Sequence, residues 1–231
     1  MPSDAHLGRI GGISAIVGVA VLFVCTMLHP MDALPGDSPA AFAEYALDRT
    51  WVATHLGQLL GVVLIATGLV ALSWKLRAGH AGAWALLAGL ATVATVSLAG
   101  ALQAVDGVAL KFAVDRWSAS AEGTRAGAFE AAYAVRQVEV GLASVTGTFF
   151  GLTVLLYGIA LMLSHLAPNW LGAFGALSGV ATLISSVIQA HAGFSAVTMA
   201  ASMPSSLFVL VWSICAGIFL LRTAGAVDNA A

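Results

Sequence analysis

The distribution of apolar and charged residues divides the chain into long apolar stretches and two polar connections. An α-helix of about 20 apolar residues crosses a hydrocarbon core of roughly 30 Å. Six stretches of about this length contain no Asp, Glu, Lys or Arg; they cover residues 10–28, 51–74, 81–105, 140–164, 169–190 and 204–221. Pro204 is expected in the first turn of the last stretch, where proline costs little. The pattern predicts an all-α, polytopic membrane protein, a six-transmembrane-helix bundle forming a single domain over residues 1–231.

The two longer connections, residues 29–50 and 106–139, lie on the same face of the membrane because successive spans alternate in direction. Ser38 and Pro39 begin a short run that ends near Arg49 and is typical of a helix at the membrane surface. Much of residues 106–139 is expected to extend the third and fourth spans beyond the bilayer. Together the connections predict a small cap on one face, with both termini on the other.

The composition narrows the class of protein further. Hydrophobic residues make up 60% of the chain and charged residues 9%, whereas a soluble domain carries roughly 25% charged residues. A soluble globular protein is thereby excluded. The 9 Lys and Arg are outnumbered by 11 Asp and Glu, so no basic face is available for the phosphate contacts of nucleic-acid binding. The expected partner is the lipid bilayer.

Basic residues are concentrated in the short loops on the face of the termini, among them Lys75 and Arg77. This density favours a cytoplasmic position for both termini of a multi-pass protein of the cell membrane. Pairs of glycines four residues apart, such as Gly57 with Gly61 and Gly147 with Gly151, allow helices to approach closely. Such faces could build a homo-oligomer or pack the bundle itself.

Titratable side chains gather at the ends of the spans on the capped face. They are His29, His55, His191, Asp106 and Glu139. Ionisable groups at this depth are costly unless they are paired, hydrated or metal-bound, so by default they indicate function.

A set of imidazoles and carboxylates is typical of a zinc or non-haem iron site. A haem between two facing imidazoles would leave the carboxylates unexplained, which makes haem the weaker hypothesis. No H-E-x-x-H, G-x-S-x-G, Cys-x-x-Cys or phosphate-binding glycine loop is present. We therefore predict a membrane-embedded, metal-dependent oxidoreductase acting on a lipophilic small molecule, with the five residues as metal ligands and Asp106 and Glu139 as catalytic groups.

Other hypotheses account for the same residues. Without a metal, Asp106 or Glu139 could serve as acid or base in isoprenoid cyclase-like chemistry. The polar groups could instead line the path of a small-solute transporter or channel subunit, or the chain could be an accessory membrane protein with no site. In that last case Asp106 and Glu139 would pair with Lys111 or Arg136 at the helix ends.

Four short motifs carry a resemblance to known proteins. They are Leu28-His29-Pro30 at the end of the first span, Trp51-Val-Ala-Thr-His55 at the start of the second, Arg77-Ala-Gly-His80 in the following turn, and Asp106-Gly107 after the third. With these motifs the chain resembles a loose group of uncharacterised bacterial six-span integral membrane proteins. That group has no established activity to carry over. The resemblance implies only that His29, His55 and Asp106 belong to one test.

Overall fold

The computed structural model describes residues 2–34 and 36–228, and within these ranges the regular structure is helical, without strands. Six helical segments are long and apolar enough to cross a membrane. The elements, in chain order, are α1 (Pro2–Met27), α2 (Ser38–Leu47), α3 (Trp51–Lys75), α4 (Ala81–Gln103), the π-helical segment η1 (Ala104–Leu110), α5 (Lys111–Ser118), α6 (Glu122–Ser164), α7 (Asn169–Ala192) and α8 (Ala196–Asp228). The predicted fold class is confirmed.

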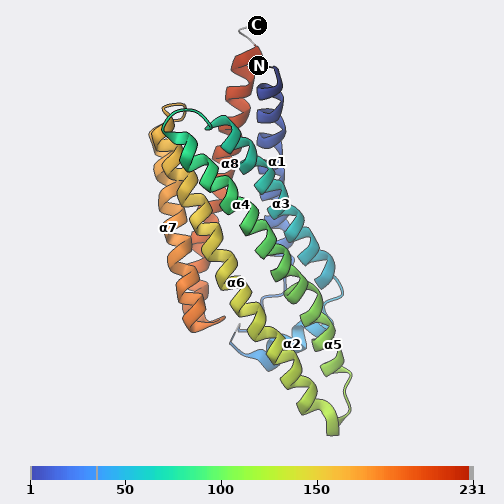
Figure 1. Ribbon diagram of the computed structural model, residues 1–231. Helices are drawn as coiled ribbons and strands as arrows, with labels where there is room; N and C mark the ends of the chain where they lie inside the picture. The colour runs from blue at the N-terminus through green and yellow to red at the C-terminus, as the bar shows by residue number, and fades with distance from the viewer. Residues whose placement is uncertain (1, 35, 229–231) are drawn as a thin grey trace.

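The six long helices pack in a closed ring, in which α1, α3, α4, α6, α7 and α8 each contact the next and α8 returns to α1. Figure 1 shows both termini at one end of this bundle, with α2 and α5 at the other end. The predicted arrangement of cap and termini on opposite faces is therefore found. The cell membrane as location and the cytoplasmic side of the termini stay predictions.

The last helix begins earlier than the sequence indicates. It starts at Ala196, and Pro204 lies inside it and not in its first turn. The cause is a local cap: the hydroxyl of Ser195 accepts from the backbone N–H of Thr198 at 3.3 Å, and its carbonyl accepts from Met199 at 2.9 Å. These bonds satisfy N–H groups of the first turn, so the helix can begin eight residues before the proline.

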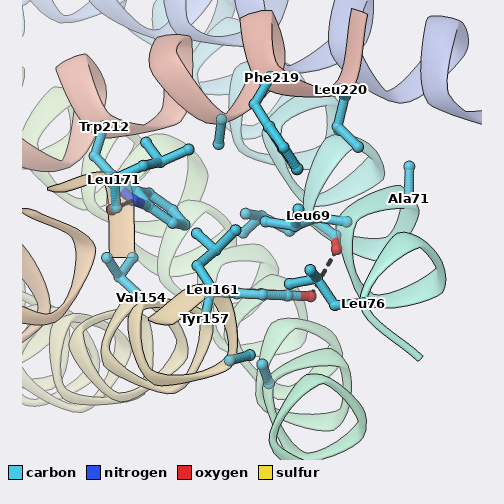
Figure 2. Packing of buried hydrophobic residues seen from close by; sticks show 14 of the residues in the cluster. Leu69, Ala71, Leu76, Val154, Tyr157, Leu161, Leu171, Trp212, Phe219 and Leu220 are labelled. Carbon is cyan, nitrogen blue, oxygen red and sulfur yellow. Dashed lines mark hydrogen bonds between the residues drawn. The ribbon is translucent and has the colours of Figure 1, made fainter. Parts of the chain in front are cut away.

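Large side chains fill the centre of the ring. Trp212 and Tyr157 are fully buried and belong to one apolar cluster with Leu69, Leu161 and Leu171. The hydroxyl of Tyr157 donates to the carbonyl of Leu69 at 2.7 Å, as Figure 2 shows, and the indole N–H of Trp212 donates to Leu171 at 3.1 Å. Both polar groups are thus satisfied inside the bundle, which explains why Trp212 lies away from the membrane interface.

Glycines set the distance between neighbouring helices. A Cβ added to Gly61 would lie 2.7 Å from the backbone nitrogen of Leu22 on α1, and one added to Gly151 would lie 2.8 Å from that of Leu183 on α7. Such contacts allow the close approach that drives helix association in lipid. The glycine pairs therefore act within one chain, and a homo-oligomer stays a prediction.

The cap has an aromatic core of its own. Phe42 and Tyr45 from α2, Val114 and Trp117 from α5, and Trp51 at the start of α3 are buried together. This cluster fixes the short helices of the cap against the extension of α6.

One cation ties the two cap helices together. The ammonium of Lys111, the first residue of α5, donates to the carbonyl of Tyr45 at 2.9 Å and to Asp115 at 2.7 Å. A cation at the carboxyl end of α2 is favourable because carbonyls there lack helical partners. Lys111 is therefore not the partner of Asp106 that a simple helix-end pairing predicts.

Candidate functional site

Between the cap and the ends of the spanning helices lies a cavity of about 1040 Å³. Its wall is formed by the end of α1 and the connection after it, by α2, by the first turns of α3 and α8, by η1, by the part of α6 around residues 136–139, and by the loop between α7 and α8. The polar side chains in this wall include His29, Tyr45, Gln58, Asp106, Arg136 and Glu139. The cavity is large enough for a small organic molecule.

His55 and Asp106 form a contact at the base of this cavity. His55 is only 1% exposed; its Nδ1–H donates to the carbonyl of Trp51 at 2.7 Å, and its Nε2 lies 3.2 Å from Oδ2 of Asp106. A carbonyl only accepts, so Nδ1 carries a proton. A favourable Nε2 contact then requires a second proton, either on the imidazole or on the carboxyl group. The contact therefore places a site for one proton between a buried imidazole and a carboxyl group that lines the cavity.

The same pair has unused hydrogen-bonding capacity. Among the residues described, Nε2 of His55 and Oδ1 of Asp106 are buried without a hydrogen-bond partner of good geometry. Buried polar atoms are rarely left unsatisfied in folded proteins, and each exception calls for an explanation. Asp106 lines the wall of the cavity, but its unpartnered Oδ1 is covered, so a ligand group would reach that atom only after a shift of the carboxyl group.

Asp106 owes its position to the π-helical segment. η1 interrupts the regular helix between α4 and α5, and π-helical turns occur frequently at functional sites. Two contacts hold this turn: the indole N–H of Trp51 donates to the carbonyl of Asp106 at 3.0 Å, and Gly107 packs against His55. A Cβ added to Gly107 would lie 2.5 Å from Cβ of His55, so glycine is required at this approach.

The second pair in the wall is Arg136 with Glu139, one turn apart on α6. Nη1 of Arg136 donates to both carboxylate oxygens of Glu139, at 3.2 and 3.1 Å, and the two residues are 7% and 3% exposed. The guanidinium carbon also lies 4.4 Å from the ring centroid of Phe194, a cation–π contact. Both carboxylate oxygens of Glu139 are therefore engaged, unlike those of Asp106.

His29 and Tyr45 complete the wall from the cap side. The ring of His29 lies 5.2 Å from that of His55 and 4.8 Å from that of Trp51, between centroids. Its Nδ1–H donates to the carbonyl of Pro30 at 2.8 Å, which leaves Nε2 as an acceptor in the neutral ring. Burial lowers the pKa of His29 and raises the pKa of Tyr45, so both side chains are held neutral.

Four of the five residues singled out from the sequence surround this one place. His29, Asp106 and Glu139 line the cavity, and His55 contacts Asp106 behind its wall. His191 does not line it: the residue is exposed at the end of α7, and the cavity is instead lined by Phe194 and Ser195.

No group of three or more His, Cys, Asp or Glu within residues 2–34 and 36–228 is placed to hold a metal ion. Of the four predicted ligands that meet here, Asp106 contacts His55 and Glu139 is paired with Arg136. His29 belongs to neither pair and donates to the carbonyl of Pro30.

Sequence reasoning missed Tyr45 and Phe194 as parts of this region. The sequence does predict the surface helix that carries Tyr45, and an aromatic side chain facing the membrane mouth was the available signal. For Phe194 the sequence holds no comparable signal, because its position follows from the loop between α7 and α8.

Fold and site together define a multi-pass helical protein with a polar cavity beneath a small cap. A family model described as a domain of unknown function, DUF4386, matches residues 10–223, and the chain belongs to this family. The resemblance to an uncharacterised membrane family is thereby confirmed. No curated protein and no solved structure matches the chain.

Proposed function

We propose that the protein is a membrane-embedded acid–base enzyme that isomerises or cyclises an unsaturated, lipophilic small molecule bound in the cavity. The observation that carries the proposal is the His55–Asp106 contact. Both ring nitrogens of a buried imidazole face oxygen atoms, and the carboxyl group faces the cavity with one oxygen unpartnered. Such a pair stores a proton where a substrate can reach it.

The two carboxyl groups have different roles in this proposal. Asp106 is the catalytic acid, because it lines the cavity and keeps a free oxygen. His55 is a positioning residue that shares the proton with Asp106. Glu139 neutralises Arg136 through both of its oxygens, so it shapes the wall and does not take the proton.

The proposed reaction is balanced without a co-reactant. The proton of the pair forms a bond to one carbon of a double bond in the substrate. The resulting carbocation then loses a proton from another carbon, and Asp106 takes that proton back. The product is an isomer of the substrate, and the His55–Asp106 pair returns to its initial state.

Solvent deuterium tests the proposal on a mixture of lipids, so the substrate need not be identified first. The purified protein is placed in nanodiscs made from total membrane lipid of the expression host and incubated in D₂O. After back-exchange in ordinary water, mass spectrometry of the extracted lipids reports deuterium that is bound to carbon. We expect time-dependent deuteration with the wild type and a loss of at least about 100-fold with Asp106→Asn, the scale of general acid catalysis.

Asp115→Asn is the matched control, because Asp115 is a cap carboxylate whose side chain is 47% exposed and paired with Lys111. It should deuterate lipid at the wild-type rate. The same deuteration by wild type and Asp106→Asn would overturn the proposal, as would its absence from both.

The metal-dependent oxidoreductase stays a prediction from sequence with less support in the geometry, because Asp106 contacts His55 and Glu139 is paired with Arg136. Metal analysis and an optical spectrum of wild type and His55→Ala, after loading with iron and with zinc, decide between the two. A stoichiometric metal that is lost in the variant would replace the acid–base proposal.

A further inference from the structure

A second, smaller pocket lies deeper in the bundle. It has a volume of about 60 Å³ and is lined by α3, α4 and α6. Its lining includes Val62, Ile65, Val96, Ala99 and Phe150 together with four threonines, of which Thr146 keeps a hydroxyl without a partner. Nearly all of the surface inside it is nevertheless apolar. An ordered water needs two to four polar partners. The pocket therefore suits hydrocarbon.

The pocket and the cavity follow each other along one seam. On α3, Gln58 lines the cavity and Val62 lines the pocket, a distance of about 6 Å along the helix axis. On α6, Glu139 lines the cavity and Thr146 lines the pocket, about 10 Å further along. The α4–η1 helix repeats the arrangement with Asp106 above and Ala99 below.

Only one polar contact described by the structure spans this seam between the two spaces. Nε2 of Gln103 donates to Oε1 of Gln58 at 3.3 Å, a long hydrogen bond, while Oε1 of Gln103 is buried without a partner. A hydrogen bond of this length is weak, and Gln58 lines the cavity, so its amide can turn into that space when the bond opens. The glutamine pair is therefore placed as a gate between cavity and pocket.

The charges around the cavity indicate which polar group would stay above the gate. The His55–Asp106 and Arg136–Glu139 pairs are each internally balanced. Asp32 and Asp37 add further carboxylates to the lining. An anionic head group would be repelled, whereas a hydroxyl can donate to an acceptor such as Nε2 of His29.

We infer that the site takes a single-chain amphiphile with a neutral, hydroxyl-type head. The head lies in the cavity, and the hydrocarbon chain passes between Gln58 and Gln103 into the pocket. The inference rests on the proposed function and names its substrate class. It also explains why the carboxyl group of Asp106 lies near an apolar pocket, since a chain that runs from the cavity into the pocket would bring its carbons past Asp106.

Photolabelling tests this placement. The probe is 1-hexadecanol with a diazirine in the middle of its chain, added to the protein in phosphatidylcholine nanodiscs and irradiated. Mass spectrometry should find the label on pocket residues such as Val62, Val96 or Phe150. Ala99→Leu and, from the opposite wall, Ala66→Leu fill the pocket and should reduce this labelling about tenfold, through lost burial of chain methylenes.

Ala101→Leu is the matched control, because it makes the same change at an exposed position of α4. It should label as the wild type does. Thermal unfolding of each variant reports whether the fold is kept, and the two independent pocket variants guard against one that fails to fold. Label confined to lipid-facing residues such as Leu60 and Val93, or unchanged pocket labelling in a folded pocket variant, overturns the inference.

Labelling and deuteration separate this inference from the proposed function. Pocket labelling does not require catalysis, so it should persist in Asp106→Asn. If Asp106→Asn abolishes deuteration while pocket labelling is absent from the wild type, the acid–base function is supported and the placement of the hydrocarbon chain in the pocket is wrong. If deuteration is absent from every variant but the pocket is labelled, the placement of the chain in the pocket is supported and the proposed acid–base reaction is wrong.

Discussion

The middle of the bundle and its capped mouth both bury polar side chains, but they treat them differently. In the middle, the hydroxyl of Tyr157 donates to the carbonyl of Leu69 and contacts Ser73 at 2.7 Å, and the hydroxyls of Thr95 and Thr153 lie 3.0 Å apart. At the mouth, His55, Asp106 and Gln103 each keep a buried atom without a partner, as far as the chain is described. The burial of polar side chains alone therefore does not distinguish interhelical hydrogen bonds from a candidate functional site. Unused hydrogen-bonding capacity separates them better: among the described residues it is concentrated at the mouth, although Thr146 beside the deeper pocket also keeps a hydroxyl without a partner.

The largest expected effect on stability is in the middle of the bundle. Trp212→Ala removes a fully buried indole and should lower the free energy of unfolding by about 4 kcal/mol. Deuteration per folded molecule should not change, because Trp212 does not line the cavity. Trp170→Ala, at a residue 58% exposed, is the control, and unfolding in mixed micelles is the measurement. An equally small loss in both variants would contradict the packing described.

The next largest effect is at the mouth. Arg136→Ala leaves the buried Glu139 without its cation and should cost about 3 kcal/mol of unfolding free energy, the scale for one orphaned partner of a buried pair. The double variant Arg136→Ala/Glu139→Gln should recover much of that loss, since no unpaired charge remains. A double-mutant cycle measures the coupling, and purely additive losses would show that the pair does not act as one unit.

A smaller loss is expected from Tyr157→Phe, which keeps the ring and removes only the hydroxyl. Its interhelical bonds to Leu69 and Ser73 predict a cost of about 1 kcal/mol in the membrane. Ser97→Ala is a control because that hydroxyl bonds only within its own helix, to Val93. If Tyr157→Phe were as stable as the wild type, the hydroxyl of Tyr157 would not stabilise the bundle. The contrast between the middle of the bundle and its capped mouth would then lack support from the middle.

The smallest effect on stability is expected where the effect on function is largest. Asp106→Asn replaces the carboxyl group with an amide that can donate to Nε2 of a neutral His55. The partner that Nε2 lacks in the wild type would then be present, so the free energy of unfolding should change by less than about 0.5 kcal/mol or rise. A loss comparable to that of Arg136→Ala would assign Asp106 a structural role.

The membrane-spanning architecture could be predicted from sequence because lipid leaves few options. Charge-free stretches of sufficient length define the spans, and Ser38-Pro39 marks α2. Pro204 led to a wrong prediction of where α8 begins, because the earlier N-cap signal at Ser195 was not used.

The site was predictable as a collection of residues but not as a set of pairs. Helices that are apolar on most faces carry little information on their rotation. The sequence therefore could not decide whether Asp106 pairs with Lys111 or Arg136 or lies beside His55. The π-helical turn of η1 and the close approach at Gly107 decide it. Likewise, His191 belongs to the correct end of its helix, yet its side chain is exposed there.

The π-helical turn also makes the length of this helix a determinant of the cap. Each residue in an α-helix turns the chain by about 100°, so removal of a single residue from η1 would rotate everything that follows by roughly that angle. Lys111 would then point away from the carboxyl end of α2, and Trp117 would leave the aromatic cluster. The packing of the cap therefore depends on the number of residues in the helix below it as well as on the side chains within the cap.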